Sequence, residues 1–542
     1  MSSSSGSLAA RPAPALPRRS AREWAGRGRE LARRHWLFVL VAACATALRV
    51  VVLLAYQQAL IFPDSERYLQ YARSFINGMW TPDWLRTSGY SLLLMPAVLA
   101  HNLAVVAAIQ HLLGLATGAL IYALLVRFGA RRWLAVLATI PVLFDPLQLV
   151  IEQYILTDVS ATFLLVVALV VLVWKRDAIG KAAPVAVGLL IAAATVIRES
   201  DLLVAIPALL YLAVVLRRRR RRAIRAGLLL LLGLLPPVLG YLGWMQVWYG
   251  SVNFVTYSNE FMYGRIAQFA DCTGLSLPSY EVHLCPPHQA AAADPNFYMW
   301  DPLSPQVTLA PADGLSKSQI VGDFNTAIIE HQPLAYVKAV AGDVIYSFSP
   351  VRGDGPEHYP VTYHEFQTYF PADPGEAATL RSYTGSGPRI QPQLADFLNG
   401  YGRFFYIPGP LLAAGLLLGV AGLAGIGRAR RSGLRADCLL FTTGVIAAIV
   451  PPFFIATFDW RYELPQLSLI PVAAVFGVLA LTGQPAVRPG PDGGESDEMT
   501  SAGPPMERAT PPLARPAADC GPPEAGCVQV SGLAGQRLGG SG

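Results

Sequence analysis

The segment PDSERYLQYARSFINGMWTPDWLRTSGY (residues 63–90) interrupts a sequence that is otherwise dominated by apolar runs. It follows the apolar run 36–56 and combines charged residues (Asp64, Arg67, Arg86), aromatic residues and a Ser-Gly-Tyr turn. A simple connector between two membrane helices does not need this combination of side chains. We therefore interpret residues 63–90 as an extracytoplasmic loop that forms part of a functional site.

The composition is that of a membrane protein. Hydrophobic residues make up 53% of the chain and charged residues only 14%. Apolar runs of about 20 residues, long enough to cross about 30 Å of hydrocarbon, recur along the sequence. We predict an all-α polytopic membrane protein with about ten spans. The predicted spans are 36–56, 102–126, 133–144, 158–174, 183–197, 202–216, 226–248, 404–426, 438–458 and 464–481.

Arginine clusters predict the orientation of these spans. They flank every second turn, as in Arg217–Arg222, whereas the other turns hold only isolated basic residues. Basic residues are enriched on the cytoplasmic side of membrane proteins. Both termini are therefore predicted to be cytoplasmic, in a multi-pass protein of the plasma membrane. Because the arginines lie beside apolar runs, the net charge of +6 does not indicate a nucleic-acid partner.

The predicted spans divide the chain into five regions. A disordered basic tail (1–35) precedes a transmembrane core (36–248) whose first external loop is 57–101. An extracytoplasmic segment (249–403), C-terminal transmembrane helices (404–482) and a disordered cytoplasmic tail (483–542) follow. Within the external segment, 316–348 predicts two amphipathic helices broken at Gln332-Pro333 and a small α-rich domain; the alternative is a loosely folded loop.

Cysteine and histidine spacing predicts no zinc site. Cys272 and Cys285 lie in the external segment, where a disulfide can form, and the sequence leaves open whether it does. Cys44 and Cys438 are interpreted as packing residues, and Cys520 and Cys527 as free cytoplasmic thiols. The irregular spacing of His283, His288, His331 and His364 indicates surface residues.

Five predicted outer turns carry charged or aromatic residues at one membrane level, where such groups are costly without a functional reason. These residues are Asp64; Glu152, Tyr154 and Asp158; Arg198, Glu199 and Asp201; Tyr263 and Arg265; and Asp459, Arg461, Tyr462 and Glu463. Three of them, Asp64, Arg198 and Arg461, have a simpler interpretation. Asp64 could cap the helix that carries Tyr68, Tyr71 and Phe75, whose rings would then serve packing or membrane anchoring. Arg198 could pair with Glu199 or Asp201, and Arg461 with Asp459 or Glu463.

Sugar transfer from a lipid phosphate needs a carboxylate to accept the proton of a hydroxyl group, arginine to neutralise the phosphate, and an apolar groove for the lipid. The sequence supplies all three. It contains no Walker loop, and no GxGxxG in a strand-helix unit, so nucleotide-sugar and ATP chemistry are disfavoured.

Four segments resemble the GT-C fold, polyprenyl-phosphate-dependent membrane glycosyltransferases, which include protein O-mannosyltransferases and the lipid A aminoarabinose transferase. They are PDSERYLQYA with RTSGYSLLLMP, EQYILTDVSATFLL, TVIRESDLLVAIP and FDWRYELPQLSLIP. With the spans, the resemblance covers about residues 36–482.

The resemblance implies an inverting transfer of a sugar from a polyprenyl-phosphate donor to a hydroxyl of a glycan, lipid or protein at the outer membrane face. It implies that Asp64 is the general base and that Asp158 lies near the donor sugar or a bound cation. The implied substrate-binding residues are Arg86, Tyr90, Glu152, Arg198, Arg265, Arg461 and Tyr462. Many members of the family carry Asp-Glu where this chain has Asp64-Ser65. The resemblance therefore leaves open whether the chain uses a divalent cation.

Two other function classes fit a polytopic protein. A transporter or lipid-linked-sugar flippase would place ionisable groups near the midplane of the membrane and show paired repeats. Neither feature is evident in the sequence. A scaffold without catalysis would not require charged residues in five outer turns.

Overall fold

The computed structural model describes residues 30, 32–174, 176–286, 295–312, 314–355, 358–369 and 374–483. Residue contacts divide the chain into one unit, Met1–Pro489, and a second, Gly490–Gly542. The predictions for the two terminal tails, for Cys520 and Cys527, and for His288 fall almost entirely outside the described residues. Everything below concerns the first unit.

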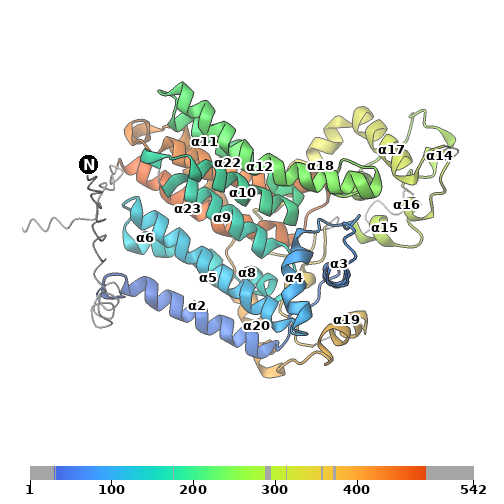
Figure 1. Cartoon of the computed structure of the whole chain (residues 1–542), viewed down its shortest axis with the longest axis horizontal. Coiled ribbons are helices and arrows are strands. Elements are labelled where there is room, and N and C mark those ends of the chain that lie inside the picture. Colours follow the sequence, from blue (N-terminus) through green and yellow to red (C-terminus); the bar gives the residue numbers. More distant parts are fainter. Residues whose placement is uncertain are drawn as a thin grey trace, which may run out of the picture. The chain divides into compact units, whose positions relative to one another are not determined.

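The described part of the chain is helical, with two isolated β-bridges and no strand, which confirms the all-α prediction. Figure 1 shows the long helices lying side by side. A helix occupies each predicted span except the third. These helices are α2 (Trp36–Ala55), α5 (Ala104–Arg127), α9 (Asp158–Trp174), α10 (Ala182–Ile197), α11 (Ala205–Val215), α12 (Arg220–Tyr249), α21 (Gly409–Ala424), α22 (Arg435–Ile455) and α23 (Leu464–Thr482).

Fewer of these helices are long and apolar enough to be complete membrane spans. Among the described residues, α2, α5, α12, α22 and the segment Trp460–Thr482 are long and apolar enough to cross a membrane. A sixth span is formed if α20 (Pro392–Phe404) and α21, which meet at a bend of 54°, count as one. Helices α9 and α10 are apolar but shorter. The protein is thus multi-spanning, and the number of crossings stays a prediction.

The predicted third span, 133–144, is wrong as a continuous helix. The structure has two short helices there, α6 (Arg132–Leu137) and α7 (Ile140–Phe144), and a third, α8 (Pro146–Gln153), follows directly. Pro141 and Pro146 lie at the starts of α7 and α8, where the missing N–H of proline costs no helical hydrogen bond. Asp145 also caps α8 by accepting a hydrogen bond from the backbone N–H of Leu147.

A buried polar network supports this broken segment from α2. The Arg49 side chain, 2% exposed, donates hydrogen bonds to the carbonyl oxygens of Leu143 (2.8 Å) and Val142 (3.1 Å) at the end of α7. It also forms an ion pair of 2.8 Å with Glu152 of α8, whose other oxygen lies 2.6 Å from His111 Nδ1. Arg49 therefore satisfies carbonyl groups that the break in the helix leaves without partners.

We expect the Arg49→Met variant to lose stability by about 3–5 kcal/mol, because it leaves Glu152 as a buried charge with one partner fewer. The double variant Arg49→Met/Glu152→Gln should recover part of that loss, since the unpaired charge is gone. Thermal unfolding of both proteins in detergent tests this. Equal unfolding temperatures for the wild type and Arg49→Met would contradict a supporting role.

The external segment contains the two predicted helices in 316–348, α17 (Lys317–His331) and α18 (Pro333–Tyr346). Ser316 and Gln319 form a capping box at the start of α17. Ile320, Phe324 and Ile328 of α17 are buried in a small core that also includes Tyr263 of α13 (Ser258–Ile266). This packing argues against a loosely folded loop.

Cys272 and Cys285, in the same external segment, form a disulfide. The question left open by the sequence is thus settled for this pair. Of the other described cysteines, Cys438 is a buried free thiol, as predicted, whereas Cys44 is exposed on α2.

Candidate active site

A cavity of about 330 Å³ lies at the end of the bundle where α2 and α22 end and α9 and α23 begin. We call it the Asp64 cavity. Asp64, Arg86, Asp158, Arg198, Arg461 and Tyr462 all line it, although they come from four separate turns of the chain. The structure thus brings together six of the nine residues that the sequence analysis selected.

The Asp64 carboxylate is held between two arginines. Arg86 Nη2 donates a hydrogen bond to Asp64 Oδ1 (2.6 Å), and Arg461 Nη1 donates one to Oδ2 (2.9 Å). Burial alone would raise the pKa of Asp64, but the two guanidinium groups outweigh it and hold the pKa well below its usual value. Asp64 lies at the start of α3 (Ser65–Ile76) without making a side-chain cap, so the capping interpretation is wrong.

Asp158, the first residue of α9, also lines the cavity. Arg198 Nη1 donates a hydrogen bond of 3.0 Å to Asp158 Oδ1, and the Arg198 guanidinium lies over the Tyr462 ring at 5.1 Å. The alternative pairing of Arg198 with Glu199 or Asp201 is not what the structure shows. Asp158 Oδ2 and Arg198 Nη2 are buried without a hydrogen-bond partner in the described part of the chain. Such groups indicate a place for a polar ligand, because buried polar atoms are normally paired.

Arg461 connects Asp64 to a second carboxylate, Asp459, in the turn before α23. Its Nε lies 2.9 Å from Asp459 Oδ2, and its guanidinium group lies 5.1 Å from the centre of the Phe62 ring. The predicted alternative of a surface pair with Asp459 is thus half right: the pair exists, but Asp459 is 2% exposed and Arg461 also reaches Asp64.

The Thr-Ser-Gly-Tyr turn places Arg86 by docking onto the end of α10. Thr87 Oγ1 donates a hydrogen bond to the carbonyl oxygen of Ile197 (2.6 Å). Gly89, the first residue of α4 (Gly89–Leu99), lies so close to α10 that a Cβ atom there would be 2.3 Å from the carbonyl oxygen of Val196. This contact requires glycine and explains the sequence Arg-Thr-Ser-Gly.

We expect Gly89→Ala to lower both activity and stability, because the added methyl group must push the turn away from α10. Overpacking of this kind costs about 1–3 kcal/mol, and the displacement also moves Arg86 away from Asp64. Gly243→Ala is the matched control, since a Cβ atom there meets nothing within 4 Å. Unfolding temperature and transfer rate of the two variants provide the test. If the two variants had the same unfolding temperature and the same transfer rate, the close contact at Gly89 would not be needed for stability or activity.

Three selected residues lie outside the lining of this cavity. Tyr90 donates a hydrogen bond to Gln110 (2.8 Å), Glu152 belongs to the Arg49 network, and Arg265 pairs with Asp343 of α18 (3.0 Å). All three side chains are buried, so each needs a polar partner inside the protein. The partners named above meet that need, and no ligand is required to explain them.

Sequence reasoning missed several residues near the site. Tyr68, interpreted as a packing or anchoring residue, lines the cavity, as do Phe261 and Tyr359 of the external segment. His364, interpreted as a surface residue, is 6% exposed, and its Nε2 lies 2.5 Å from Asp459 Oδ1. No local pattern marks Tyr359 or His364, because their positions depend on how the external segment folds back over the bundle.

Asp201 is a buried carboxyl group beside the site. It lies in the short helix η2 (Glu199–Val204), is 1% exposed, and neither of its oxygens has a hydrogen-bond partner among the described residues. Burial raises its pKa to about 7; Arg198 opposes this shift, and the charges of Asp158 and Glu199 add to it. A raised pKa favours the protonated form in the folded protein.

This shift predicts a pH-dependent effect of Asp201→Asn. The folded state binds the Asp201 proton more tightly than the unfolded chain, so its contribution to stability is full in acid and is lost as pH rises toward 7. Removing the carboxyl group should therefore raise the unfolding temperature at about pH 8 by about 1–3 °C, with a smaller change at about pH 5. A shift of equal size at both pH values would contradict a buried, protonated Asp201.

Residues 96–220 match the family model of dolichyl-phosphate-mannose-protein mannosyltransferases. Over this segment the chain is similar to that family, and its long apolar helices are those of a multi-spanning membrane protein. Among solved structures it is similar to the S. cerevisiae protein O-mannosyltransferase Pmt1–Pmt2 complex bound to the sugar donor, with 18% identity and a TM-score of 0.32. That match covers 42% of this chain and 36% of the other, so the chain spans about a third of that protein's length. No curated protein sequence matches the chain.

The family match supports the resemblance drawn from the sequence. The matched segment runs through α5 to α11 and supplies Asp158 and Arg198 to the Asp64 cavity. Asp64, Arg86 and Arg461 lie outside the matched segment. Their roles therefore depend on the geometry of the cavity.

Proposed function

We propose that the chain transfers a sugar from a polyprenyl-phosphate donor to a hydroxyl group of an acceptor, on the outer face of the plasma membrane and with inversion at the anomeric carbon. One observation supports this most directly. Three carboxylates (Asp64, Asp158 and Glu199) and three arginines line one cavity, which also holds unpartnered polar atoms and several apolar residues.

Asp64 is suited to accept the proton of the acceptor hydroxyl. Arg86 and Arg461 keep it ionised, so it can receive a proton without first losing one. In the proposed step the acceptor oxygen attacks the anomeric carbon, its proton passes to Asp64, and the bond from the anomeric carbon to the phosphate oxygen breaks. The prenyl phosphate leaves with the electron pair, and a single displacement inverts the anomeric centre.

The arginines are suited to stabilise the leaving phosphate. Arg86, Arg198 and Arg461 are each paired with a carboxylate in the structure, and Arg198 keeps a free Nη2. Arginine binds phosphate through its planar set of donors. A phosphate in the cavity would compete with Asp64 for Arg86 and Arg461. Donor binding would thereby weaken their hold on Asp64 and raise its basicity at the point where a base is needed.

The apolar wall of the Asp64 cavity suits the lipid part of such a donor. It includes Leu202, Leu203, Pro451, Pro452 and Ile455. Leu203 is 43% exposed and Ile455 40% exposed, so this wall continues onto the outer surface of the helix bundle. A prenyl chain could therefore leave the cavity between η2 and the end of α22 and remain in the bilayer, with its phosphate among the arginines.

Two features support an extracytoplasmic site. The cavity lies at the opposite end of the helices from the arginine-rich turn before α12 and from the arginines that follow α21. Basic turns favour the cytoplasm. The Cys272–Cys285 disulfide, which follows α13 near the cavity-lining Phe261, is typical of an oxidising compartment.

The proposal is tested with the purified full chain in nanodiscs, radiolabelled polyprenyl-phosphate-mannose or polyprenyl-phosphate-arabinose as donor, and cell-envelope extract as acceptor source. We expect labelled product, release of prenyl phosphate, and an anomeric configuration opposite to that of the donor. Assays with and without a chelator test whether transfer requires a divalent cation. Movement of intact donor across the membrane without product would instead indicate a flippase.

A further inference from the structure

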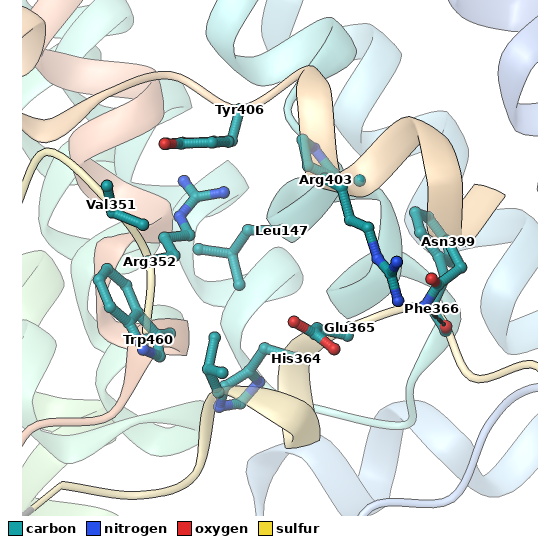
Figure 2. Close-up of a pocket in the computed structure, with 13 residues that line it drawn as sticks. Leu147, Val351, Arg352, His364, Glu365, Phe366, Asn399, Arg403, Tyr406 and Trp460 are labelled. Carbon is teal, nitrogen blue, oxygen red and sulfur yellow. Dashed lines mark hydrogen bonds between the residues drawn. The ribbon is translucent and has the colours of Figure 1, made fainter. Parts of the chain in front are cut away.

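A second cavity, of about 240 Å³, lies beside α8 and α20 and shares no lining residue with the Asp64 cavity. We call it the Arg403 cavity. Figure 2 shows side chains from α20, from the helix η3 (Val361–His364) and the residues after it, and from the turn before α23 surrounding one space. The residues that matter below are Glu365, His364, Asn399, Arg403, Tyr406 and Trp460.

Several polar groups in the Arg403 cavity have unused hydrogen-bonding capacity. Arg403 and Glu365 are exposed, and within the described ranges neither forms an ion pair. Asn399 uses its Nδ2 to donate to the carbonyl oxygen of Phe366 (2.9 Å), which leaves Oδ1 as an acceptor. His364 Nδ1 is buried without a partner in the described part of the chain. Donors and acceptors lie side by side, which suits hydroxyl groups, because each hydroxyl both donates and accepts.

The charges of the cavity disfavour an anionic ligand. Arg352, which also lines it, is already neutralised by Asp145 (2.7 Å) and by Glu463 (3.4 Å). Glu365, which also lines the cavity, offsets the charge of Arg403, and Figure 2 shows both side chains around the same space. No surplus of positive charge therefore remains in the lining of the Arg403 cavity to hold a phosphate.

Size and aromatic content point to a ring. Tyr406 and Trp460 form aromatic walls around the Arg352 guanidinium, which lies 5.7 Å and 6.0 Å from the two ring centres. Ligand sites typically combine apolar and aromatic walls with a few directed polar groups, and sites for drug-sized molecules measure about 300–1,000 Å³. The smaller Arg403 cavity fits a single ring-sized unit.

The Arg403 cavity is joined to Asp64 by a row of close polar contacts. His364 Nε2 lies 2.5 Å from Asp459 Oδ1, and Asp459 Oδ2 lies 2.9 Å from Arg461 Nε. Arg461 Nη1 in turn donates a hydrogen bond of 2.9 Å to Asp64. Trp460, between Asp459 and Arg461 in sequence, forms part of the cavity wall. The two cavities thus share the turn 459–461 as a common partition.

We infer that the Arg403 cavity binds a neutral saccharide unit through its hydroxyl groups. This rests on the proposed function in one respect: the saccharide is a non-reacting sugar residue of a glycan acceptor, held on the far side of the partition from the donor. Binding there positions the acceptor. Variants of this cavity should therefore raise KM for the acceptor several-fold and leave kcat nearly unchanged.

The binding test uses the full-length protein in nanodiscs and saturation-transfer NMR with methyl α-mannopyranoside, methyl β-glucopyranoside and methyl α-arabinofuranoside. We expect saturation transfer to at least one glycoside and a loss of signal of at least fivefold in Glu365→Ala and Arg403→Gln. Both side chains are exposed, so these variants should fold. Gln393→Ala, exposed on α20 outside the cavity, is the matched control and should keep the signal.

Other outcomes overturn the inference. They are the absence of any glycoside signal, a signal that survives both cavity variants, or a signal lost only in Asp64→Asn, which would place the sugar in the Asp64 cavity. Competition by inorganic phosphate would indicate an anion site. Because binding is measured without a donor, saccharide binding in a protein that transfers nothing would refute the proposed function and leave this site in place.

Discussion

Asp64→Asn is expected to lower the rate of sugar transfer by about 10²–10⁴-fold, the usual contribution of a positioned general base. The amide keeps the size of the side chain and can still accept hydrogen bonds from Arg86 and Arg461, but it cannot take the proton of the acceptor. The effect should therefore fall on kcat. Single-turnover release of prenyl phosphate from a labelled donor measures it without interference from product dissociation.

A control is needed because this substitution also removes a charge that neutralises two arginines. Asp396→Asn, on the exposed side of α20, removes a carboxylate without touching the cavity and should transfer sugar at the wild-type rate. An Asp64→Asn protein that folds and still transfers sugar within a few-fold of wild type would exclude Asp64 as the base.

Arg461→Gln should be the second most damaging single change. It removes the group that reaches both Asp64 and Asp459, and with it a cation that we propose stabilises the leaving phosphate. Loss of one such electrostatic contact typically costs about 10²–10³-fold in kcat. Arg461→Lys should be impaired less but clearly, since a single ammonium group does not replace two guanidinium contacts. Steady-state kinetics with a polyprenyl-phosphate donor provide both values.

The interpretation of this loss depends on stability. Arg389→Gln serves as the control, because Arg389 is exposed and does not line the Asp64 cavity. Thermal unfolding separates a missing phosphate ligand from a protein that no longer folds. If Arg461→Gln lowered the unfolding temperature strongly while the remaining folded fraction kept its kcat, the arginine would be a structural partner of Asp459 and not a phosphate ligand.

The positions of the helices were predictable because membrane spans are long apolar runs that are visible in the hydropathy of the sequence. The first outer turn was also informative, since Asp64, Arg86 and Gly89 lie within one short segment and each has a distinct task in the structure. Charge alone, however, did not separate ligand-facing groups from buried structural pairs. Glu152 and Arg265 have the same polarity as Asp158 and Arg198, yet both are engaged elsewhere, with Arg49 and with Asp343.

The remaining features depend on contacts between distant parts of the chain. The break at Asp145-Pro146 is visible as a proline in the sequence, but its stabilisation by Arg49 requires α2 to pack beside it. His364 meets Asp459 across 95 residues, and the Arg403 cavity forms only where η3, α20 and the turn before α23 come together. Contacts between such distant segments leave no pattern of periodicity or spacing in the sequence.

The central claim is that a prenyl phosphate occupies the Asp64 cavity with its phosphate on the arginines. An electron cryo-microscopy map of the full chain in nanodiscs with bound polyprenyl phosphate tests it most directly. The account predicts phosphate density within hydrogen-bond distance of Arg198 and Arg461, and lipid density leaving between Leu203 and Ile455. Phosphate density at any other site, with the Asp64–Arg86 and Asp64–Arg461 contacts intact and the cavity unfilled, would contradict it.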